Sequence, residues 1–537
     1  MRVAPVSRKK TVPMPTFGFL IDNRKCIGCH ACTVACKSEH QVPLGVDRTW
    51  VKYVEKGTFP SNRRYFTVMR CNHCDWAPCV TICPVTALYR RDDGVVDFNS
   101  DRCIGCKSCL QACPYDALYI DPDSRTAAKC NFCSHRLEQG LQPSCVVVCP
   151  EQAIITGDLD DPTSEIARLL DRHPTQVRKP EKGTRPKLFY LEGEAAALVP
   201  TQTEAHGRSL SRRGAYVPTD GQAIEPGPGS PPGGGEAAPP RRVALPLAAP
   251  PSPPRRVYDV RPRAPAWGWQ VAGYTWTKSV ATGPLLAVAA ARLLTGAPLG
   301  AGMAAALGIV ALGFLAVTAA LLVADLKRPA RFLSVLLRPQ WHSWLVRGAY
   351  LLTGYGAVLT GWLVARLAGA APLAEALLWP GVFLAACSAV YTAFLFAQAK
   401  GRDFWQNPLL AIHLLAHALL AGSAVWLLLD VLAGGGAPRA PWLVLAGALV
   451  FSLIAILAEL LTTPPTTDAH LALRWIVGRP NGRWFWGAGV GAGHVLPLLL
   501  LATGVDAAAA LAAVLALGGM LVVEWLWVQA PQQVPLS

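Results

Sequence analysis

Four groups of four cysteines constrain the fold of this chain more than any other feature of its sequence. The 537 residues contain 17 cysteines, and all of them except Cys387 lie between positions 26 and 149. Two groups share the spacing Cys-x2-Cys-x2-Cys-x3-Cys, and three groups end in Cys-Pro. In chain order the groups are Cys26, Cys29, Cys32 and Cys36; Cys71, Cys74, Cys79 and Cys83; Cys103, Cys106, Cys109 and Cys113; and Cys130, Cys133, Cys145 and Cys149.

Iron–sulfur clusters explain these spacings better than zinc or disulfides do. Structural zinc sites use separated Cys-x2-Cys pairs or mixtures of cysteine and histidine, which would suit only the fourth group. Disulfides need an oxidising compartment, and the first 20 residues contain neither the apolar run of a secretory signal nor a twin arginine. Three closely spaced cysteines followed by a fourth and a proline form the run that ligates [4Fe–4S] clusters in bacterial ferredoxins.

The four groups are expected to work as two pairs. In two-cluster ferredoxins the fourth cysteine of each run ligates the other cluster. The short segment between Cys83 and Cys103 contains strand-like stretches and joins its flanking groups as the two halves of a ferredoxin are joined. The second group therefore pairs with the third, and the first pairs with the fourth. We predict an α+β, double ferredoxin-like iron–sulfur domain.

The last 270 residues are dominated instead by long apolar runs. Because a hydrocarbon core about 30 Å thick takes about 20 helical residues, each run is long enough to cross a bilayer. The sequence therefore predicts an all-α domain of eight transmembrane helices, at residues 271–294, 302–325, 344–368, 378–399, 408–432, 441–463, 484–503 and 506–528.

A segment rich in proline and glycine separates the two halves. Stretches such as EPGPGSPPGGGEAAPP cannot bury enough apolar surface to offset the entropy lost on ordering. The predicted organisation is an iron–sulfur domain at residues 1–192, a linker at 193–266 and a membrane domain at 267–537.

Basic residues indicate the orientation of the predicted helices. The net charge is +15, and most basic residues of the membrane half lie in the loops after the second, fourth and sixth spans. By the positive-inside rule those loops face the cytoplasm, and an even number of spans puts the iron–sulfur domain on the same side. We predict a multi-pass inner-membrane protein. Basic and aromatic residues are not interleaved in a patch, so no nucleic-acid partner is expected.

The cysteine-rich half resembles the four-cluster iron–sulfur subunits of molybdopterin oxidoreductase complexes, in the polysulfide, dimethyl sulfoxide and nitrate reductase group. Matching stretches include CNHCDWAPCVTICPVTAL and DRCIGCKSCLQACPYDAL. The resemblance implies a separate molybdopterin catalytic subunit, and a periplasmic iron–sulfur domain as the alternative location. It also implies four [4Fe–4S] clusters, ligated by Cys26, Cys29, Cys32 and Cys149; Cys130, Cys133, Cys145 and Cys36; Cys71, Cys74, Cys79 and Cys113; and Cys103, Cys106, Cys109 and Cys83.

The membrane half resembles NrfD-like subunits, of the polysulfide reductase type, through ADLKRPARFLSVLLRPQWHSWLVRGAY and WQNPLLAIHLLAHALLAG. This resemblance implies a haem-free subunit that exchanges electrons with menaquinone or ubiquinone in the first four-helix bundle. Lys278 and Asp325 are the predicted quinone-site residues, with Tyr274, Trp276 and Tyr391 as further candidates. In the simpler alternatives, Lys278 extends to the interface and Asp325 pairs with the next basic residues, Lys327 or Arg328.

Other ionisable residues within the predicted spans also need an explanation, because such residues are costly in a bilayer and usually functional. His413 and His417 lie one helical turn apart, and Glu459, His494 and Glu524 lie in later spans. Either histidine could ligate a b-type haem together with His494, or both could line a polar seam between helices.

The two halves together predict an electron-transfer subunit that is not itself the catalytic one. It would pass single electrons along four clusters between the quinone pool and the catalytic subunit. One alternative is an ion-translocating redox module of a larger respiratory assembly, with Glu459, His413 and His417 relaying protons. Another is the equivalent subunit of a hydrogenase or formate dehydrogenase complex.

Overall fold

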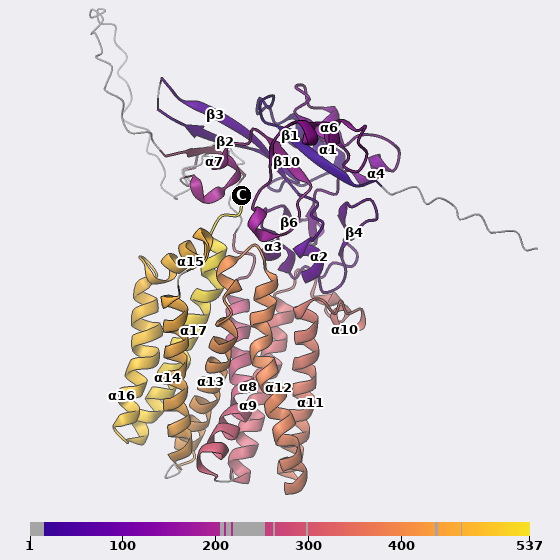
Figure 1. Cartoon of the computed structure of the whole chain (residues 1–537). Helices are drawn as coiled ribbons and strands as arrows, with labels where there is room; N and C mark the ends of the chain where they lie inside the picture. Colours follow the sequence, from indigo (N-terminus) through magenta and orange to yellow (C-terminus); the bar gives the residue numbers. More distant parts are fainter. Residues whose placement is uncertain are drawn as a thin grey trace, which may run out of the picture.

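The chain folds into a cysteine-rich α+β domain that sits on one end of a bundle of long helices (Figure 1). The C-terminus lies between these two parts. The computed structural model describes residues 15–58, 60–203, 209–210, 216–217, 253–260, 264–296, 299–434, 439–462 and 464–537.

Two sheets and three small hairpins form the framework of the cysteine-rich domain and the segment that follows it. The first sheet has the strand order β8 (Ile154–Asp158), β1 (Phe17–Asp22), β10 (Leu188–Leu191) and β9 (Thr175–Gln176). The second has the order β13 (Arg255–Tyr258), β2 (Thr49–Lys56) and β3 (Arg63–Arg70). The hairpins pair β4 (Leu88–Arg90) with β5 (Val96–Phe98), β6 (Leu118–Ile120) with β7 (Ala127–Lys129), and β11 (Ser209–Leu210) with β12 (Tyr216–Val217).

Short helices begin within or next to the cysteine groups. The second and third groups are built alike, because each forms a turn, a five-residue helix and then a hairpin. Burial of β-branched residues such as Val95 and Val96 anchors the first of these hairpins in the core. The helices of this domain are α1 (Ala31–His40), α2 (Pro78–Ile82), α3 (Ser108–Ala112), α4 (Ser134–Leu137), α5 (Ser144–Val147), α6 (Glu165–Arg172), η1 (Pro180–Lys182), α7 (Ala195–Leu198) and η2 (Pro200–Gln202).

The predicted linker contributes to the cysteine-rich domain at both of its ends. At its start, the carbonyl of Ala197 in α7 accepts a hydrogen bond from Lys52 Nζ at 3.2 Å. At its end, β13 adds a strand to β2, and Trp50 Nε1 donates to Asp259 Oδ1 at 2.9 Å. Composition averaged over the whole predicted linker did not reveal these short ordered ends. Most of the segment between them lies outside the described residues.

Each predicted span coincides with one long helix, or with two consecutive helical segments for the seventh. These elements are α8 (Trp269–Thr295), α9 (Ala301–Ala324), α11 (Trp344–Leu367), α12 (Ala371–Gln398), α13 (Leu410–Leu432), α14 (Arg439–Leu461), η5 (Arg483–Val495) with α16 (Leu496–Ala502), and α17 (Asp506–Gln529). Shorter elements lie at the end nearest the cysteine-rich domain: η3 (Pro329–Arg331), α10 (Ser334–Leu337), η4 (Asp403–Gln406) and α15 (Thr467–Val477) connect long helices, and η6 (Ala530–Gln533) follows the last one.

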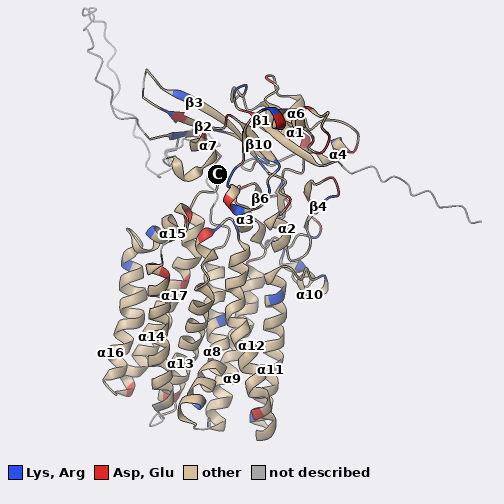
Figure 2. Ribbon diagram, viewed as in Figure 1, with Lys and Arg blue, Asp and Glu red and all other residues tan. Residues whose placement is uncertain are grey.

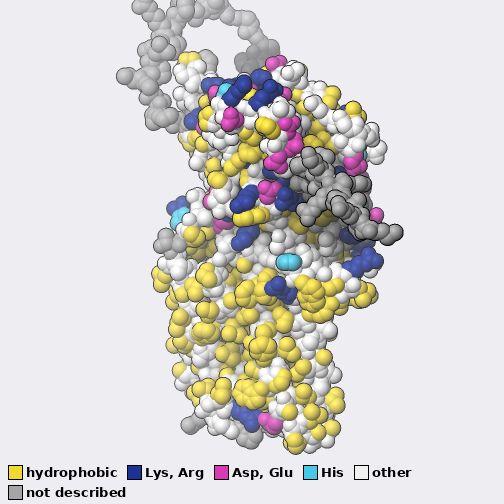
Figure 3. All heavy atoms as spheres, turned by 45° about the vertical axis from the view of Figure 1, so that its right-hand side comes forward, with side chains coloured by type: hydrophobic (Ala, Val, Ile, Leu, Met, Phe, Trp, Pro, Cys, Tyr) yellow, Lys and Arg dark blue, Asp and Glu magenta, His cyan; other side chains and the backbone are white. Residues whose placement is uncertain are grey.

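Within the described residues, seven of the long helical elements are long and apolar enough to cross a membrane. The exception is α8, which contains Lys278, Arg292 and several threonines and is buried by its neighbours along much of its length. Figure 3 shows apolar side chains covering the lower part of the molecule, and Figure 2 shows few charged residues along the helices. The chain is therefore a multi-pass membrane protein.

Glycines allow α8 and α13 to cross in backbone contact. A Cβ atom on Gly422 would lie 1.9 Å from the carbonyl carbon of Gly283, so neither position accepts a side chain without a shift. Small residues at helix crossings are how membrane helices gain dispersion contacts in the absence of a hydrophobic driving force. This crossing joins the bundle of α8, α9, α11 and α12 to the bundle of α13, α14, η5–α16 and α17.

The element η5 is wound as a π-helix, where the sequence predicted an ordinary span. Its sequence GAGVGAGH contains little side-chain volume, and a Cβ on Gly493 would lie 2.6 Å from Gly519 Cα of α17. The wide turn places the Gly489 carbonyl so that it accepts a hydrogen bond from His494 Nδ1 at 2.8 Å. Such π-helical segments occur often at functional positions.

Candidate cluster sites and membrane cavity

Cavity linings and the electrostatic neighbours of the thiols group the sixteen cysteines into four sets, each with three cysteines of one group and the last cysteine of another. Two sets surround small cavities of ≈ 20 Å³ each. The first cavity is lined by Cys83, Cys103, Cys106 and Cys109. The second is lined by Cys26, Cys29, Cys32 and Cys149.

The other two sets are recognised from the electrostatic neighbours of their thiols. Burial, and then the thiolates of Cys130 and Cys145, raise the pKa of Cys36, and Cys133 adds to the effect. In the same way, burial and the neighbouring Cys113 and Cys71 raise the pKa of Cys79. Cys74 lies beside Cys71 and Cys113. These neighbours are the sets that the family resemblance implies.

The chemistry of these sets suits iron–sulfur clusters. All the cysteines are free thiols, and most are buried. Burial raises the pKa of Cys32 to about 11 and that of Cys106 to about 12, so these thiols would be protonated at neutral pH without a metal. Bound iron stabilises the thiolate form and removes the cost of burying four sulfur ligands together.

Backbone amides point at several of the sulfurs. The amides of Gly105 and Ala127 each donate to Cys103 Sγ at 3.4 Å, and the amide of Ala87 donates to Cys83 Sγ at 3.2 Å. Gly105 has a φ of 70°, in the left-handed region that favours glycine. Hydrogen bonds to cluster sulfurs are one of the protein's means of setting a reduction potential.

A fully buried arginine lies between two of the sets. Arg70 Nη1 is 3.2 Å from Cys145 Sγ, and Cys32 and Cys130 are among the other thiolates that act on the guanidinium. The guanidinium also lies over the ring of Phe19, 4.4 Å from its centre. Arg70 Nε and Nη2 are buried without a hydrogen-bond partner in the described part of the chain. The inorganic sulfides of clusters on either side would supply acceptors for these donors.

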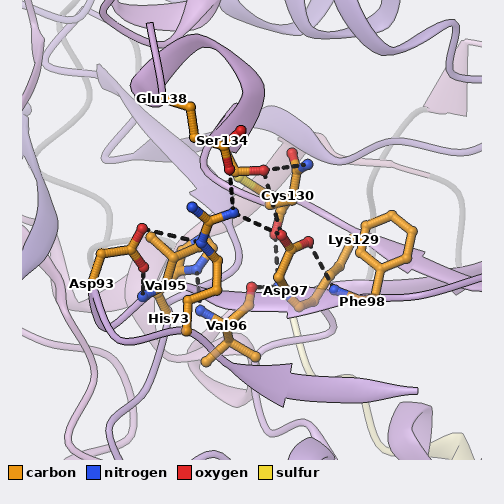
Figure 4. A network of polar contacts seen from close by, with 12 residues as sticks. His73, Asp93, Val95, Val96, Asp97, Phe98, Lys129, Cys130, Ser134 and Glu138 are labelled. Atoms are coloured by element: carbon orange, nitrogen blue, oxygen red, sulfur yellow. Dashed lines mark hydrogen bonds and ion pairs between the residues drawn. The ribbon is translucent and has the colours of Figure 1, made fainter. Parts of the chain in front are cut away.

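A second buried cation ties the turn of the second group to that of the fourth (Figure 4). Lys129 Nζ donates to the carbonyls of Val96 and Cys130, the latter at 2.8 Å. The amide of Val96 in turn donates to His73 Nδ1 at 3.2 Å. Burial raises the pKa of the Cys71 thiol, and the Lys129 ammonium opposes that rise.

The turn of the third group rests directly on the membrane helices. The backbone amides of Lys327 and Arg328, just beyond α9, donate to the carbonyls of Gly105 and Ile104 at 3.2 and 3.1 Å. Trp267 Nε1, just before α8, donates to the carbonyl of Cys106 at 3.2 Å. The set that contains Cys103, Cys106 and Cys109 is therefore the one held against the bundle.

A cavity of ≈ 250 Å³ lies between this turn and helices α8, α9, α11 and α12. Cys106 and Ser108 line its upper wall. Its other walls are mostly leucine, valine and alanine, and its polar groups include Asp325, Tyr274 and Tyr391. An apolar cavity with a few convergent polar groups is the usual form of a small-molecule site.

The structure brings three of the five predicted quinone-site residues to this cavity. Asp325 Oδ1 accepts an ion-paired hydrogen bond from Lys107 Nζ at 2.6 Å, and not from Lys327 or Arg328. Lys107 belongs to the cysteine run CIGCKSC, so the pair joins the two domains, and sequence reasoning missed it. The one available signal was a lysine between two cluster cysteines.

The other two predicted residues lie behind or away from the cavity wall. Lys278 is fully buried and does not extend to the interface. Its Nζ donates to Thr392 Oγ1 at 2.6 Å and lies 4.9 Å from the ring centre of Tyr391. Trp276 faces a different helix, where its Nε1 donates to the carbonyl of Leu517 at 2.9 Å.

The buried histidines contact carboxylates and backbone, as expected for a polar seam. His413 Nδ1 lies 3.0 Å from Glu459 Oε2, and His417 Nδ1 lies 3.1 Å from Glu524 Oε1. His494 uses both ring nitrogens, one toward Gly489 and the other, Nε2, at 2.9 Å from Ser452 Oγ.

Comparison with known families divides the chain as the structure does. Residues 261–535 match the family described as polysulphide reductase, NrfD. Residues 63–159 match a 4Fe-4S dicluster domain.

Curated relatives match the cysteine-rich half. It is 45% identical over 202 residues to a subunit of tetrathionate reductase from Salmonella typhimurium, covering 37% of this chain and 81% of the relative. It is 42% identical over 187 residues to a polypeptide of polysulfide reductase from Wolinella succinogenes, covering 34% and 97%. It is 35% identical over 222 residues to the arsenate respiratory reductase iron–sulfur subunit ArrB of a Shewanella species, covering 32% and 95%.

Proposed function

The chain belongs to the polysulphide reductase NrfD family, fused in one polypeptide to an iron–sulfur subunit of reductase complexes, and from this premise we propose that it carries electrons between the quinone pool and a separate molybdopterin catalytic subunit. The proposed path is four [4Fe–4S] clusters held by the sixteen cysteines in the four sets described above. The fold of the iron–sulfur half is proposed to be a doubled ferredoxin, in which α2, β4 and β5 and their repeat α3, β6 and β7 are the two halves of one ferredoxin unit.

One observation carries this proposal: a cysteine of the third group and the membrane helices line the same cavity. Cys106 belongs to a proposed cluster set, and Tyr274 and Tyr391 belong to the first helix bundle. A quinone ring in this cavity would lie directly beside a cluster ligand, so electrons need not cross the rest of the bundle. The [4Fe–4S] groups supply one-electron chemistry, and the protein separates the two electrons of a quinol into single transfers.

The polar residues of the cavity are proposed to bind and orient the quinone ring. The Asp325 carboxylate can accept a proton from a quinol hydroxyl, because general bases must lie within hydrogen-bond reach of the proton they take. Lys107 holds that carboxylate in place through their ion pair. The tyrosines Tyr274 and Tyr391 offer hydroxyls for the ring oxygens, while the surrounding leucines and valines exclude water.

The opposite face of the iron–sulfur domain is the proposed docking surface for the catalytic subunit. Cys29 is exposed, just before α1, beside the cavity of the set that contains Cys26, Cys32 and Cys149. Ile27, Val34 and Val147 are 54%, 63% and 62% exposed around or near it. Large exposed apolar side chains around a redox centre suit a partner that receives electrons at short range.

For the membrane domain we propose eight crossings, with α8 as the first, in an inner membrane. Helices α8, α11 and α13 begin, and α9, α12 and α17 end, at contacts with the iron–sulfur domain or its neighbouring loops. Many basic residues lie at this end, which supports a cytoplasmic iron–sulfur domain by the positive-inside rule. Three of them, Arg328, Arg331 and Arg402, also bond to the iron–sulfur domain and so have a second role. A reporter fused at Ser537 tests the side, and a periplasmic signal contradicts this orientation.

Two conservative variants, each with a matched control, test the cavity in the purified full chain with its clusters. Asp325→Asn and Tyr391→Phe are expected to slow cluster reduction by a soluble quinol about 10-fold or more, because each removes a polar contact at the ring. The matched controls are Asp430→Asn, in a cavity at the far end of the bundle, and Tyr355→Phe, a buried tyrosine that bonds to the Ala281 carbonyl. Equal rates in variants and controls would contradict the cavity as the quinone site.

A further inference from the structure

A line of buried ionisable side chains runs from α8 through α17 and α13 to α14, and the electron path makes no use of it. The line consists of Lys278, Glu524, His417, His413 and Glu459, none of them more than 6% exposed. Ionisable residues inside a membrane domain are expensive, and those that persist commonly serve ion or proton movement.

Four members of the line, Glu524, His417, His413 and Glu459, contact one another in order. His417 and His413 are one turn apart on α13, with ring centres 4.2 Å apart. His417 Nδ1 is 3.1 Å from Glu524 Oε1 on α17, and His413 Nδ1 is 3.0 Å from Glu459 Oε2 on α14. Trp527 Nε1 also donates to Glu459 Oε2, at 2.8 Å.

One end of the line lies behind the wall of the proposed quinone cavity. Lys278 Nζ bonds to Thr392 Oγ1, and its ammonium lies over the ring of Tyr391, which lines the cavity. The charged group that acts on the Lys278 ammonium is Glu524. Tyr274, also in the cavity wall, lies within electrostatic reach of both Glu524 and Asp325.

Two polar atoms of the line have no partner within the described residues. His417 Nε2 and Glu459 Oε1 are both buried and unpaired. A pair with only a structural role would be more stable if these atoms were hydrogen-bonded or absent, because an unpaired polar atom in a low-dielectric interior is costly. A group that must accept and release a proton needs such a free position.

The charges of the line leave room for one mobile proton. Two carboxylates, Glu524 and Glu459, face one ammonium, Lys278, so neutrality in the buried site requires one further positive charge. The two histidines are too close for both to be positively charged at once, so they share one extra proton, which supplies this charge. The remaining titratable neighbour, His494 on η5, is committed to Ser452 and Gly489 and does not join the line.

The line rises toward the face that carries the iron–sulfur domain. At 1.5 Å per residue from the helix end nearest that domain, the depths along the line are about 14 Å for Lys278, 8 Å for Glu524, 10 Å for His417, 4 Å for His413 and 3 Å for Glu459, so the line ends nearer that face than it begins. The near end of α14 is identified by α15, which follows it and whose Asp468 pairs with Lys179 of the iron–sulfur domain.

We propose that these five residues form a proton relay that connects the quinone cavity to the iron–sulfur face of the membrane, and not to the opposite face. The proposal rests on the proposed function. When one quinol is oxidised, two electrons pass to the clusters and two protons are released. The relay carries the two protons, one after the other, from the cavity through Glu524 and the histidine pair to Glu459, and the quinone form remains behind.

This relay makes turnover electroneutral, because electrons and protons leave on the same side. The test uses the full chain with its clusters in liposomes, selected for an outward iron–sulfur domain by protease accessibility. Quinol is supplied in the bilayer, and ferricyanide, which cannot cross it, is supplied outside. Each quinol then reduces two ferricyanide ions and yields two protons. A trapped pH dye and an external one report where the protons appear.

The wild-type chain is expected to acidify the exterior while the internal pH stays constant. Glu524→Gln and His417→Gln are expected to slow external proton release about 10-fold, while His494→Gln, a matched buried histidine off the line, keeps the wild-type rate. Iron content and reduction by dithionite confirm that the variants are intact.

Two results would overturn the relay while leaving electron transfer in place. The first is acidification of the liposome interior by the wild-type chain, a measurement that needs no variant. The second is equal proton release in Glu524→Gln, His417→Gln and His494→Gln. A wild-type chain that passes no electrons from quinol to ferricyanide would instead overturn the proposed function itself.

Discussion

The iron–sulfur domain and the membrane bundle both bury charged side chains, but they neutralise them in different ways. In the iron–sulfur domain, the buried cations Arg70 and Lys129 lie beside cysteine thiols. In the bundle, Lys278 meets neutral oxygens, while buried carboxylates face histidines that can gain or lose a proton. The proposed electron path therefore lies in the half whose buried cations lie beside thiols, and the proposed proton relay lies in the half whose buried carboxylates face histidines.

The largest expected effect is the loss of the cluster that lies against the bundle. Cys106→Ala removes a proposed ligand next to the cavity, so the chain should lose about 4 of about 16 irons and all reduction of the remaining clusters by quinol. Iron analysis and electron paramagnetic resonance measure both. The control is Cys387→Ala, on α12 and outside the four sets. If quinol still reduces the remaining clusters in Cys106→Ala, electrons have a route that avoids this cysteine set. That result would contradict the contrast drawn between the two halves.

A second variant disrupts the bundle without touching a charged group. Gly422→Leu forces a side chain into the backbone contact with Gly283, and overpacking of this kind costs about 1–3 kcal/mol or more. The thermal unfolding temperature in detergent should fall for this variant and stay near wild type for Gly447→Leu, where no atom lies within 4 Å of the added Cβ. Equal losses in the two variants would contradict the close crossing of α8 and α13.

A third variant refines the contrast by removing a fixed charge from the iron–sulfur domain. Arg70→Met should make the potentials of the two neighbouring clusters more negative, by an amount on the order of 60–120 mV, equivalent to about 1.4–2.8 kcal/mol for one electron. A redox titration followed by electron paramagnetic resonance measures the shift. Arg70→Lys keeps the charge and should have cluster potentials close to those of the wild type. A shift in Arg70→Lys as large as that in Arg70→Met would show that packing, not charge, is responsible.

The smallest effect concerns a buried lysine away from the clusters. Burial lowers the pKa of Lys52 from 10.5 to about 7, so the folded state binds fewer protons than the unfolded state between these values. Stability contributed by this site should therefore rise as pH increases from about 7 to 10.5. Lys52→Met should remove that rise and stabilise the chain at pH 7 by about 1 kcal/mol, as measured by thermal unfolding across this range. If the unfolding temperature of Lys52→Met depends on pH as that of the wild type does, the result would contradict this effect of the buried lysine.

Features carried by local spacing could be predicted from the sequence. The ligand groups follow from cysteine spacing within short runs, and the long helices follow from apolar length. The position of Asp325 at the cytoplasmic end of its predicted span is also such a feature, and Asp325 lines the cavity, whereas Lys278, predicted from the same argument, does not. These are properties of single segments.

Features that depend on contacts between distant segments could not be predicted. Asp325 pairs with Lys107, which is 218 residues away, instead of with its sequence neighbours. Trp276 faces Leu517 because the rotation of α8 is set by packing against other helices. The partners of Lys278, the strand β13 and the π-helical winding of η5 have the same origin.

Electron transfer between a quinol in the membrane cavity and the cysteine set of Cys103, Cys106, Cys109 and Cys83 is the step on which the proposed function depends. It can be measured by anaerobic addition of a soluble quinol to the purified full chain, followed by electron paramagnetic resonance. We expect the signal of reduced [4Fe–4S] clusters in the wild-type chain and its loss in Asp325→Asn at the same time point. A chain that shows this signal after dithionite but none after quinol would contradict the proposed transfer.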